Sequence, residues 1–375
     1  MDFDIGIMFA APFDALVPLF DWRGPEPDME EKTISMRKNI VYGFISLVVS
    51  TIVLILAVES VGRFIVYVKY GVSGKSYGLW QYDAELGAVH ASNAYNSNAE
   101  TNNLGFRNRE DVFRPKPKDA LRIIAYGGST TFCFNLYTDQ AWPTQLQNLL
   151  RSAGNPKDQV LNAGAILWSM AHEITRAKRD LPMLHPDYVV LYSGFNEVLN
   201  AYAATSEGKD LAAGIAQGRP VFATNLDQDR WLKRNSVVIR FLDYELDPGL
   251  LDFSNNELAP GPTEDLIMRH YLMVLGQFID LIKQHGATPV YVIMGGLRTA
   301  DGGIPELLQY SRNGAQLARD RNVLVVDAQE VVDGYAGDKR DLFIESGVHW
   351  TELGAKLLAE FIQAKVFPAR TSRPS

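Results

Sequence analysis

The strongest constraint on the fold is a regular alternation of short apolar runs with longer amphipathic stretches. Strand-like runs occur at 121–126, 160–163, 188–192, 289–294 and 323–326. Helical patterns lie between or after them, at 142–153, 171–181, 263–285, 305–321 and 351–367. This alternation is typical of a parallel sheet covered by helices on both faces. The sequence therefore predicts a three-layer α/β/α domain, spanning about residues 118–370, with a five-stranded parallel sheet.

Two segments depart from this rhythm. Residues 59–117 hold an amphipathic stretch, which either continues a helix or lies at an interface, and then many Gly, Asn, Ser and Tyr residues. Their composition predicts turns and irregular structure with a short hairpin. Residues from about 204 to 262 interrupt the strand–helix pattern. Because long structureless loops are rare in compact domains, we expect an inserted cap there; a surface insertion without a role is the alternative.

An uncharged run at 40–58, IVYGFISLVVSTIVLILAV, predicts a transmembrane helix. As a helix it is roughly 28 Å long, enough to cross a hydrocarbon core, and it lacks the polar stripe of a soluble helix. Basic residues lie on both sides, so the positive-inside rule is nearly balanced. Since no clean cleavage site follows, we expect an uncleaved signal anchor in the cytoplasmic membrane with the large domain outside the cytoplasm. Residues 1–39 are either a cytoplasmic tail or precede a true start at Met36.

Composition and missing motifs argue against several classes of function. The net charge of −8 and the lack of a Lys/Arg cluster argue against nucleic-acid binding. One cysteine, Cys133, excludes an internal disulfide. No Gly-Lys-Ser/Thr loop or dinucleotide signature is present, and the histidines are not spaced as metal ligands. Nothing in the sequence implies a cofactor.

Four short motifs follow predicted strands or precede the last predicted helix. They are GGSTT at 127–131, NAG at 162–164, GFNE at 194–197 and GVHW at 347–350. The first places Ser129 at the tip of a strand-to-helix turn, where its hydroxyl is exposed for nucleophilic attack. His349 lies just before a helix. An early serine and a late histidine at the edge of one sheet predict an acyl hydrolase or acyl transferase.

In this chain order the motifs resemble the four blocks of the SGNH (GDSL-like) hydrolase superfamily, over about residues 121–367. The resemblance implies the flavodoxin-like fold of SGNH hydrolases, with Ser129 as nucleophile and His349 as general base. It assigns the oxyanion hole to the backbone N–H groups of Ser129 and Gly164 and to the side-chain amide of Asn196. Each residue also has a structural alternative: a helix cap for Ser129, a turn with positive φ for Gly164, an Asx-turn for Asn196 and a buried structural role for His349.

The sequence departs from the family pattern at two places. The first block reads Gly-Gly-Ser where Gly-Asp-Ser is commoner. The aspartate usually found three residues before the histidine is Ser346 here. Either Glu345 reaches His349 through a one-residue bulge, or a backbone carbonyl orients the imidazole ring.

Three functions remain compatible with these motifs. The leading prediction is a membrane-anchored serine ester hydrolase whose substrate is a lipid or an acylated glycan. An O-acyltransferase or deacetylase acting on a cell-envelope glycan uses the same serine–histidine pair. A catalytically idle binding domain is the third alternative, and the serine at position 346 favours it.

Overall fold

The computed structural model describes residues 28–70, 76–83, 85–96, 98–197, 236–239, 264–300, 302–303, 308–344 and 347–368. The predicted cap at 204–262 thus lies almost entirely outside the described residues. The chain divides into two compact units, Met1–Val61 and Gly62–Ser375.

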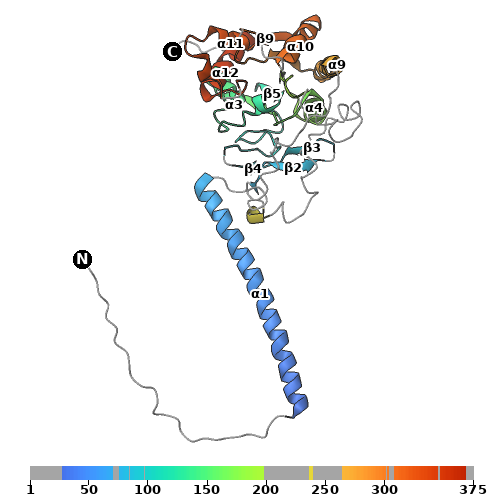
Figure 1. Ribbon diagram of the computed structural model, residues 1–375, viewed down its shortest axis with the longest axis vertical. Helices are drawn as coiled ribbons and strands as arrows, with labels where there is room; N and C mark the ends of the chain where they lie inside the picture. Colours follow the sequence, from blue (N-terminus) through green and yellow to red (C-terminus); the bar gives the residue numbers. More distant parts are fainter. Residues whose placement is uncertain are drawn as a thin grey trace, which may run out of the picture. The chain divides into compact units, whose positions relative to one another are not determined.

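A five-stranded parallel sheet forms the centre of the second unit (Figure 1). Its strands are β5 (Arg122–Gly127), β6 (Gln159–Asn162), β7 (Tyr188–Tyr192), β8 (Thr288–Ile293) and β9 (Leu324–Asp327). They lie in the order β6-β5-β7-β8-β9, and all four neighbouring pairs are parallel. In register, Ala125 of β5 pairs with Asn162 on one side and with Val190 on the other. The predicted five-stranded parallel sheet is confirmed.

Helices cover both faces of the sheet, as predicted. Side chains alternate across β5, so Ile124 and Tyr126 join one buried cluster and Ile123 and Ala125 join another. The first cluster includes α4 (Met170–Leu184), α9 (Glu264–Gln284) and α10 (Gln309–Asp320). The second includes α3 (Trp142–Ala153), α11 (Gln329–Gly334) and α12 (Glu352–Val366). The fold is therefore three-layered.

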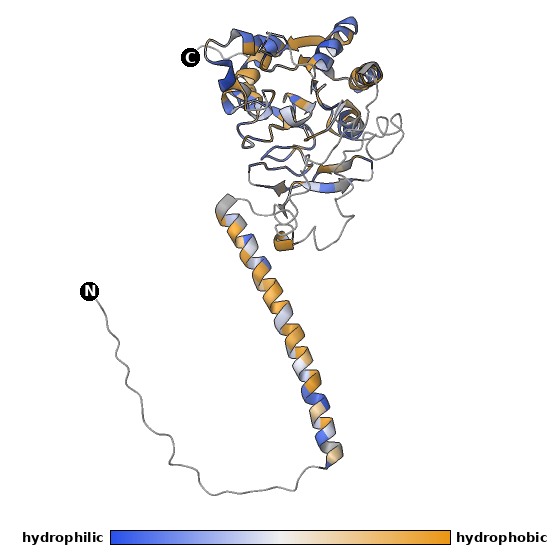
Figure 2. Ribbon diagram, in the orientation of Figure 1, coloured by the Kyte–Doolittle hydropathy of each residue, from blue (hydrophilic) through white to orange (hydrophobic). Residues whose placement is uncertain are grey.

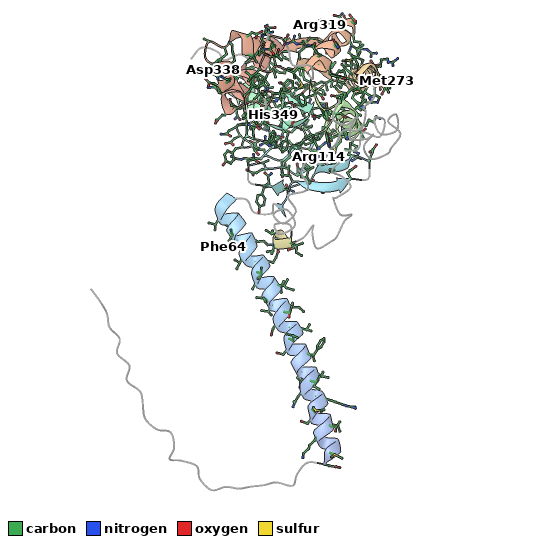
Figure 3. All side chains as sticks on the ribbon, in the orientation of Figure 1. Phe64, Arg114, Met273, Arg319, Asp338 and His349 are labelled. Atoms are coloured by element: carbon green, nitrogen blue, oxygen red, sulfur yellow. The ribbon has the colours of Figure 1, made fainter. Side chains whose placement is uncertain are left out.

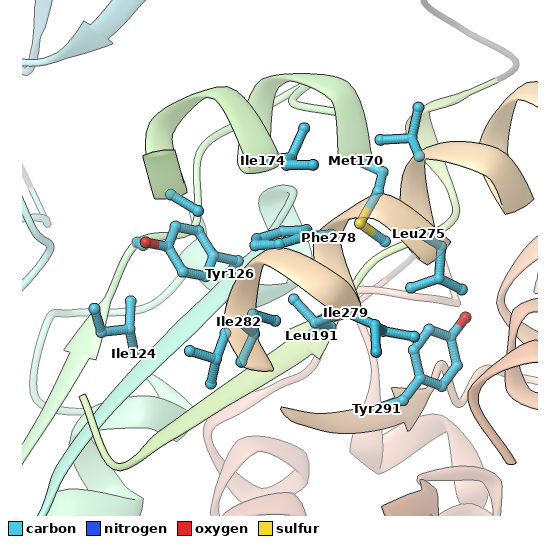
Figure 4. Packing of buried hydrophobic residues seen from close by; sticks show 14 of the residues in the cluster. Ile124, Tyr126, Met170, Ile174, Leu191, Leu275, Phe278, Ile279, Ile282 and Tyr291 are labelled. Atoms are coloured by element: carbon cyan, nitrogen blue, oxygen red, sulfur yellow. The ribbon is translucent and has the colours of Figure 1, made fainter. Parts of the chain in front are cut away.

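In the first cluster, apolar side chains of the strands pack against those of the helices (Figure 4). Phe278 of α9 lies edge-on to Tyr126, with ring centroids 5.4 Å apart. Its neighbours Ile279 and Ile282 are fully buried, which follows from their positions on one helical face. The bounds of α9 agree with the prediction within one residue. In contrast, α4 continues past Pro182 to Leu184, three residues beyond the predicted end. A proline in the last turn displaces only one hydrogen bond, and the buried Leu184 stabilises the extension.

The segment before the sheet packs against it. It contains β1 (Ser76–Tyr77) paired in parallel with β4 (Ala94–Tyr95), and an antiparallel hairpin of β2 (Trp80–Asp83) and β3 (Gly87–His90). Further along, the Arg107 N–H donates to Asn162 O at 2.9 Å. The Asn108 side chain accepts from Asn162 N–H at 3.0 Å and donates to Val160 O at 2.9 Å. This segment therefore occupies the outer edge of β6.

One long helix, α1 (Met29–Tyr70), precedes the strands in the chain. Its 42 residues are about 63 Å long at the usual helical rise. The stretch Lys32–Ile65 is long and apolar enough to cross a membrane, and a signal sequence would satisfy the same criteria of length and composition. Figure 2 shows that apolar residues predominate along most of it. The helix extends through residues 59–70, so the amphipathic stretch continues it.

Candidate active site

Ser129 lies where β5 meets a short helix, α2 (Ser129–Phe132). Two glycines make this turn possible. A Cβ at Gly127 would lie 2.3 Å from Tyr192 O, and one at Gly128 would lie 2.5 Å from Asn196 Nδ2. Any larger residue would push the turn away from β7 and its loop. Ser129 is half-buried as the first residue of α2, while the three residues after it are buried.

His349 meets Ser129 across 220 residues of sequence. The Ser129 Oγ and His349 Nε2 atoms are 2.8 Å apart. His349 lies inside the sheet-containing unit (Figure 3), between the 3₁₀ helix η4 (Lys339–Leu342) and α12. The structure thus brings together the two residues that the sequence predicts as nucleophile and base.

Backbone and side-chain bonds hold the histidine loop. Ile344 N–H donates to His349 O at 2.9 Å, and Leu297 N–H donates to Gly347 O at 2.8 Å. The buried Trp350 donates its indole N–H to Tyr192 OH at 2.9 Å. Because Tyr192 ends β7, this bond ties the residue after His349 to the sheet.

Burial lowers the pKa of His349 to about 4. Its ring packs edge-on against Phe134, with centroids 4.7 Å apart. At neutral pH the imidazole is therefore uncharged, and with its proton on Nδ1 it can accept the hydroxyl proton at Nε2. Glu345 and Ser346 lie outside the described residues, so the assignment of Glu345 as orienting acid stays a prediction.

Asn196 lies beside the nucleophile turn, as its sequence position after β7 predicts. Its side chain is buried, and Nδ2 donates to Trp168 O at 2.8 Å. A primary amide carries two N–H bonds, so one remains for another acceptor. The proximity of Nδ2 to Gly128 places this amide next to Ser129.

Gly164 also lies against the nucleophile helix, but its amide is engaged elsewhere. Its N–H donates to Asn162 Oδ1 at 3.0 Å, and Asn162 Nδ2 donates to Thr131 O at 3.0 Å. The role of the Gly164 N–H in an oxyanion hole stays a prediction. The observed requirement is steric, because a Cβ at Gly164 would lie 2.4 Å from Phe132 N.

We expect Gly164→Ala to destabilise the protein by about 1–3 kcal/mol, because the added methyl group must displace the backbone of α2. The apparent Tm of the full-length protein in detergent measures this loss. Gly334→Ala is the matched control, because no atom lies within 4 Å of the added Cβ there. Equal Tm values for the two variants would contradict the steric role of Gly164.

No sequence pattern indicates the part that Arg107 plays at this site. Arg107 is fully buried, and its guanidinium donates to the backbone oxygens of Phe132 and Leu136. It lies 4.6 Å over the Phe132 ring, so a cation holds the C-terminal end of α2. Leu167, in the loop after β6, has a φ of 62°, a conformation uncommon for leucine. Among the described residues, no group of three His, Cys, Asp or Glu side chains is arranged to hold a metal ion.

Comparison with known proteins gives the family. The model of the GDSL-like Lipase/Acylhydrolase family matches residues 125–357. No curated protein matches the chain. Similar solved structures include a putative lipolytic protein of the G-D-S-L family from Desulfitobacterium hafniense DCB-2, with 13% identity and a TM-score of 0.41 over 65% of this chain and 99% of that one. TesA has 15% identity and a TM-score of 0.42 over 66% and 99% of the two chains. Because the family model covers more than half of the sequence, the chain belongs to the GDSL-like lipase/acylhydrolase family, whose members hydrolyse esters.

Proposed function

We propose that this enzyme is a membrane-anchored serine ester hydrolase that works through an acyl-serine intermediate. The contact that carries the proposal is the 2.8 Å distance between Ser129 Oγ and His349 Nε2. It joins a hydroxyl at a strand-to-helix turn to an imidazole that burial keeps uncharged. These are the two groups that nucleophilic acyl transfer requires.

In the proposed first step, Ser129 Oγ attacks the ester carbonyl carbon while its proton passes to His349 Nε2. The carbonyl oxygen becomes an oxyanion, which the Ser129 N–H and the second N–H of Asn196 stabilise. The intermediate collapses when the C–O bond to the alcohol breaks and the alcohol takes the proton from His349. Water then attacks the acyl-serine with His349 as base, and the acid and free Ser129 are released. The Gly164 N–H can donate to the oxyanion only if its hydrogen bond to Asn162 Oδ1 breaks.

Ester hydrolysis tests the proposal directly. Full-length protein in detergent is incubated with p-nitrophenyl esters of graded chain length, acid-quenched, and digested for mass spectrometry. We expect turnover and an acyl group on the peptide that carries Ser129. An acyl-serine that forms but is not hydrolysed would favour transfer to a glycan hydroxyl over hydrolysis. A protein that forms no acyl-serine with any ester would refute the proposal. A catalytically idle binding domain would then be the remaining alternative.

The lowered pKa of His349 predicts the pH dependence. The base must be uncharged, so kcat/KM rises with pH through the pKa of His349, near 4, and not through the ordinary histidine value of 6.5. The rate at pH 5.5 is then close to that at pH 7.5. A pH-stat titration of ester hydrolysis measures the profile.

Phe134→Ala and Phe134→Leu form a matched pair for that profile. Loss of the ring exposes His349 to water, which favours the imidazolium, so we expect the acid limb of Phe134→Ala to move to higher pH. Leucine keeps part of the apolar cover and should move it less. A wild-type acid limb centred at pH 6.5 would show that burial does not shield His349.

The anchor is proposed from α1. Its run at 40–58 carries no charge, and we place the catalytic domain outside the cytoplasm. We expect the full-length protein to stay in the membrane after alkaline carbonate washing. A variant with Val48→Lys and Ile52→Lys should be released, because each lysine near the helix centre costs about 2.5–3.5 kcal/mol on insertion. Release of the unmodified protein rules the anchor out, and full protection from external protease reverses the topology.

A further inference from the structure

A buried carboxyl group directly follows Asn196. Glu197 is 7% exposed, and its Oε1 accepts the backbone N–H of Met170 at 2.9 Å. Met170 is the first residue of α4, where a helix leaves N–H groups without intrahelical acceptors. Glu197 supplies one such acceptor, and the positive end of the helix dipole favours its negative charge.

Asn196 and Glu197 bind the same short stretch of chain. Asn196 Nδ2 donates to Trp168 O at 2.8 Å, and Glu197 Oε1 accepts from the N–H two residues later. Two successive residues of the β7 loop are thus bonded at two points to the loop that enters α4. We call this pair of bonds the two-point clamp. With the Asn196–Trp168 bond alone, the Asn196 amide and the Trp168 carbonyl could shift together. The second bond, from Met170 N–H to Glu197, holds both in place.

Stability alone does not account for Glu197. Burial raises the pKa of Glu197 to about 7. A second buried carboxyl, Glu173, has a pKa well above its ordinary value because of burial and the nearby Glu197. Glu173 accepts from Ser193 Oγ at 2.6 Å. The Oε2 atom of neither side chain has a hydrogen-bond partner among the described residues. Because a buried carboxyl without a cation is costly, a neutral acceptor such as glutamine would satisfy the Met170 N–H at lower cost if the role of position 197 were purely structural.

We propose that Glu197 is a positioning residue that holds the Asn196 amide toward the oxyanion through the two-point clamp. The inference rests on the proposed function, because it requires Asn196 to bind the oxyanion. Glu197 acts through the Met170 N–H and touches neither the substrate nor the reacting atoms. An amide misplaced by about 1 Å can cost up to 10²-fold in rate, so loss of the clamp should be visible in kcat.

A double-mutant cycle in the full-length protein tests this coupling. Its corners are the wild type, Asn196→Ala, Glu197→Ala and the double variant. Rates are measured both for ester hydrolysis and for covalent labelling by a fluorophosphonate. We expect Glu197→Ala to lower kcat roughly 10- to 100-fold with little change in KM. In the Asn196→Ala background the same change should have almost no further effect.

Conservative variants separate the hydrogen bond from the side chain. Glu197→Gln keeps an oxygen that accepts from Met170 N–H, so it should recover most of the lost rate. Glu173→Gln, in the same buried site but outside the clamp, should lose no more than a few-fold.

Met170→Pro breaks the clamp from its other side. Proline lacks the N–H yet suits the first position of a helix. The preceding Ser169 has an extended conformation (φ −98°, ψ 173°) that proline tolerates. Met170→Ala is the matched control, because it also removes the buried side chain but keeps the N–H. We expect Met170→Pro to be slower than Met170→Ala by a factor similar to that of Glu197→Ala.

The outcomes distinguish the inference from the proposed function. Suppose that Asn196→Ala is slow and that the double variant loses rate by the product of the two single losses. Glu197 then has only a structural role, and the inference fails while the proposed function stands. Equal rates for Met170→Pro and Met170→Ala also overturn it, even if Glu197→Ala does not fold. If Asn196→Ala hydrolyses and labels at the wild-type rate, the proposed oxyanion hole fails, and the clamp has no catalytic role.

Discussion

We expect Ser129→Ala to abolish both ester hydrolysis and covalent labelling by a fluorophosphonate. The alanine lacks the only atom that the proposed mechanism uses as nucleophile, and loss of such a serine lowers kcat by a factor on the order of 10⁶. In-gel fluorescence of the labelled full-length protein and a coupled ester assay measure the two effects. Folding should be retained, because Ser129 is half-buried and its Oγ bonds only to His349 among the described residues.

Thr130→Val is the matched control for this prediction. It removes the next hydroxyl along the same turn, from a buried residue, while keeping the side-chain shape. It should label at a rate close to that of the wild type. Labelling of Ser129→Ala to the wild-type level would assign the nucleophile to another residue.

Asn196→Ala should lower turnover by roughly 10²–10³ with a modest effect on stability. It removes a donor that stabilises the transition state, which typically contributes about 3–4 kcal/mol. The ground state loses one hydrogen bond to Trp168 O, which contributes about 1 kcal/mol. The effect should appear in kcat, with KM nearly constant, because the oxyanion exists only after attack.

Asn98→Ala controls for the loss of an asparagine amide. Asn98 Nδ2 donates to the backbone oxygen of Phe134 at 2.6 Å, so the deletion again removes an amide–carbonyl bond beside the nucleophile turn. We expect a rate within a few-fold of the wild type. Similar losses in both variants would mean that Asn196 supports the loop without binding the oxyanion.

Much of the sheet could be predicted from local sequence. The strands are mostly apolar runs, as expected for strands that are buried on both faces, and each follows or precedes a segment with helical periodicity. Because all strands run in parallel, the residues after β5 and β7 must meet at one sheet edge. This is why Ser129 and Asn196 could be placed together without a structure.

The details of the site depend on contacts that the sequence does not encode locally. Gly164 is an example: its neighbours Thr131 and Phe132 come from another element, so the reason for a glycine there is visible only in three dimensions. Arg107 contacts carbonyls 25 and 29 residues away. The engagement of Gly164 N–H by Asn162 is the exception, because an asparagine two residues before a glycine is a familiar local turn signal.

The covered edge of β6 has a practical consequence for protein production. The predicted sheet domain begins at about residue 118, just before β5, which makes that position a tempting place to start a shortened gene. A fragment cut there lacks Arg107 and Asn108, so the backbone groups that they occupy on β6 become unpaired. Open strand edges recruit other chains. Such fragments should accumulate in inclusion bodies, whereas gene boundaries placed before β1 should yield dispersed protein.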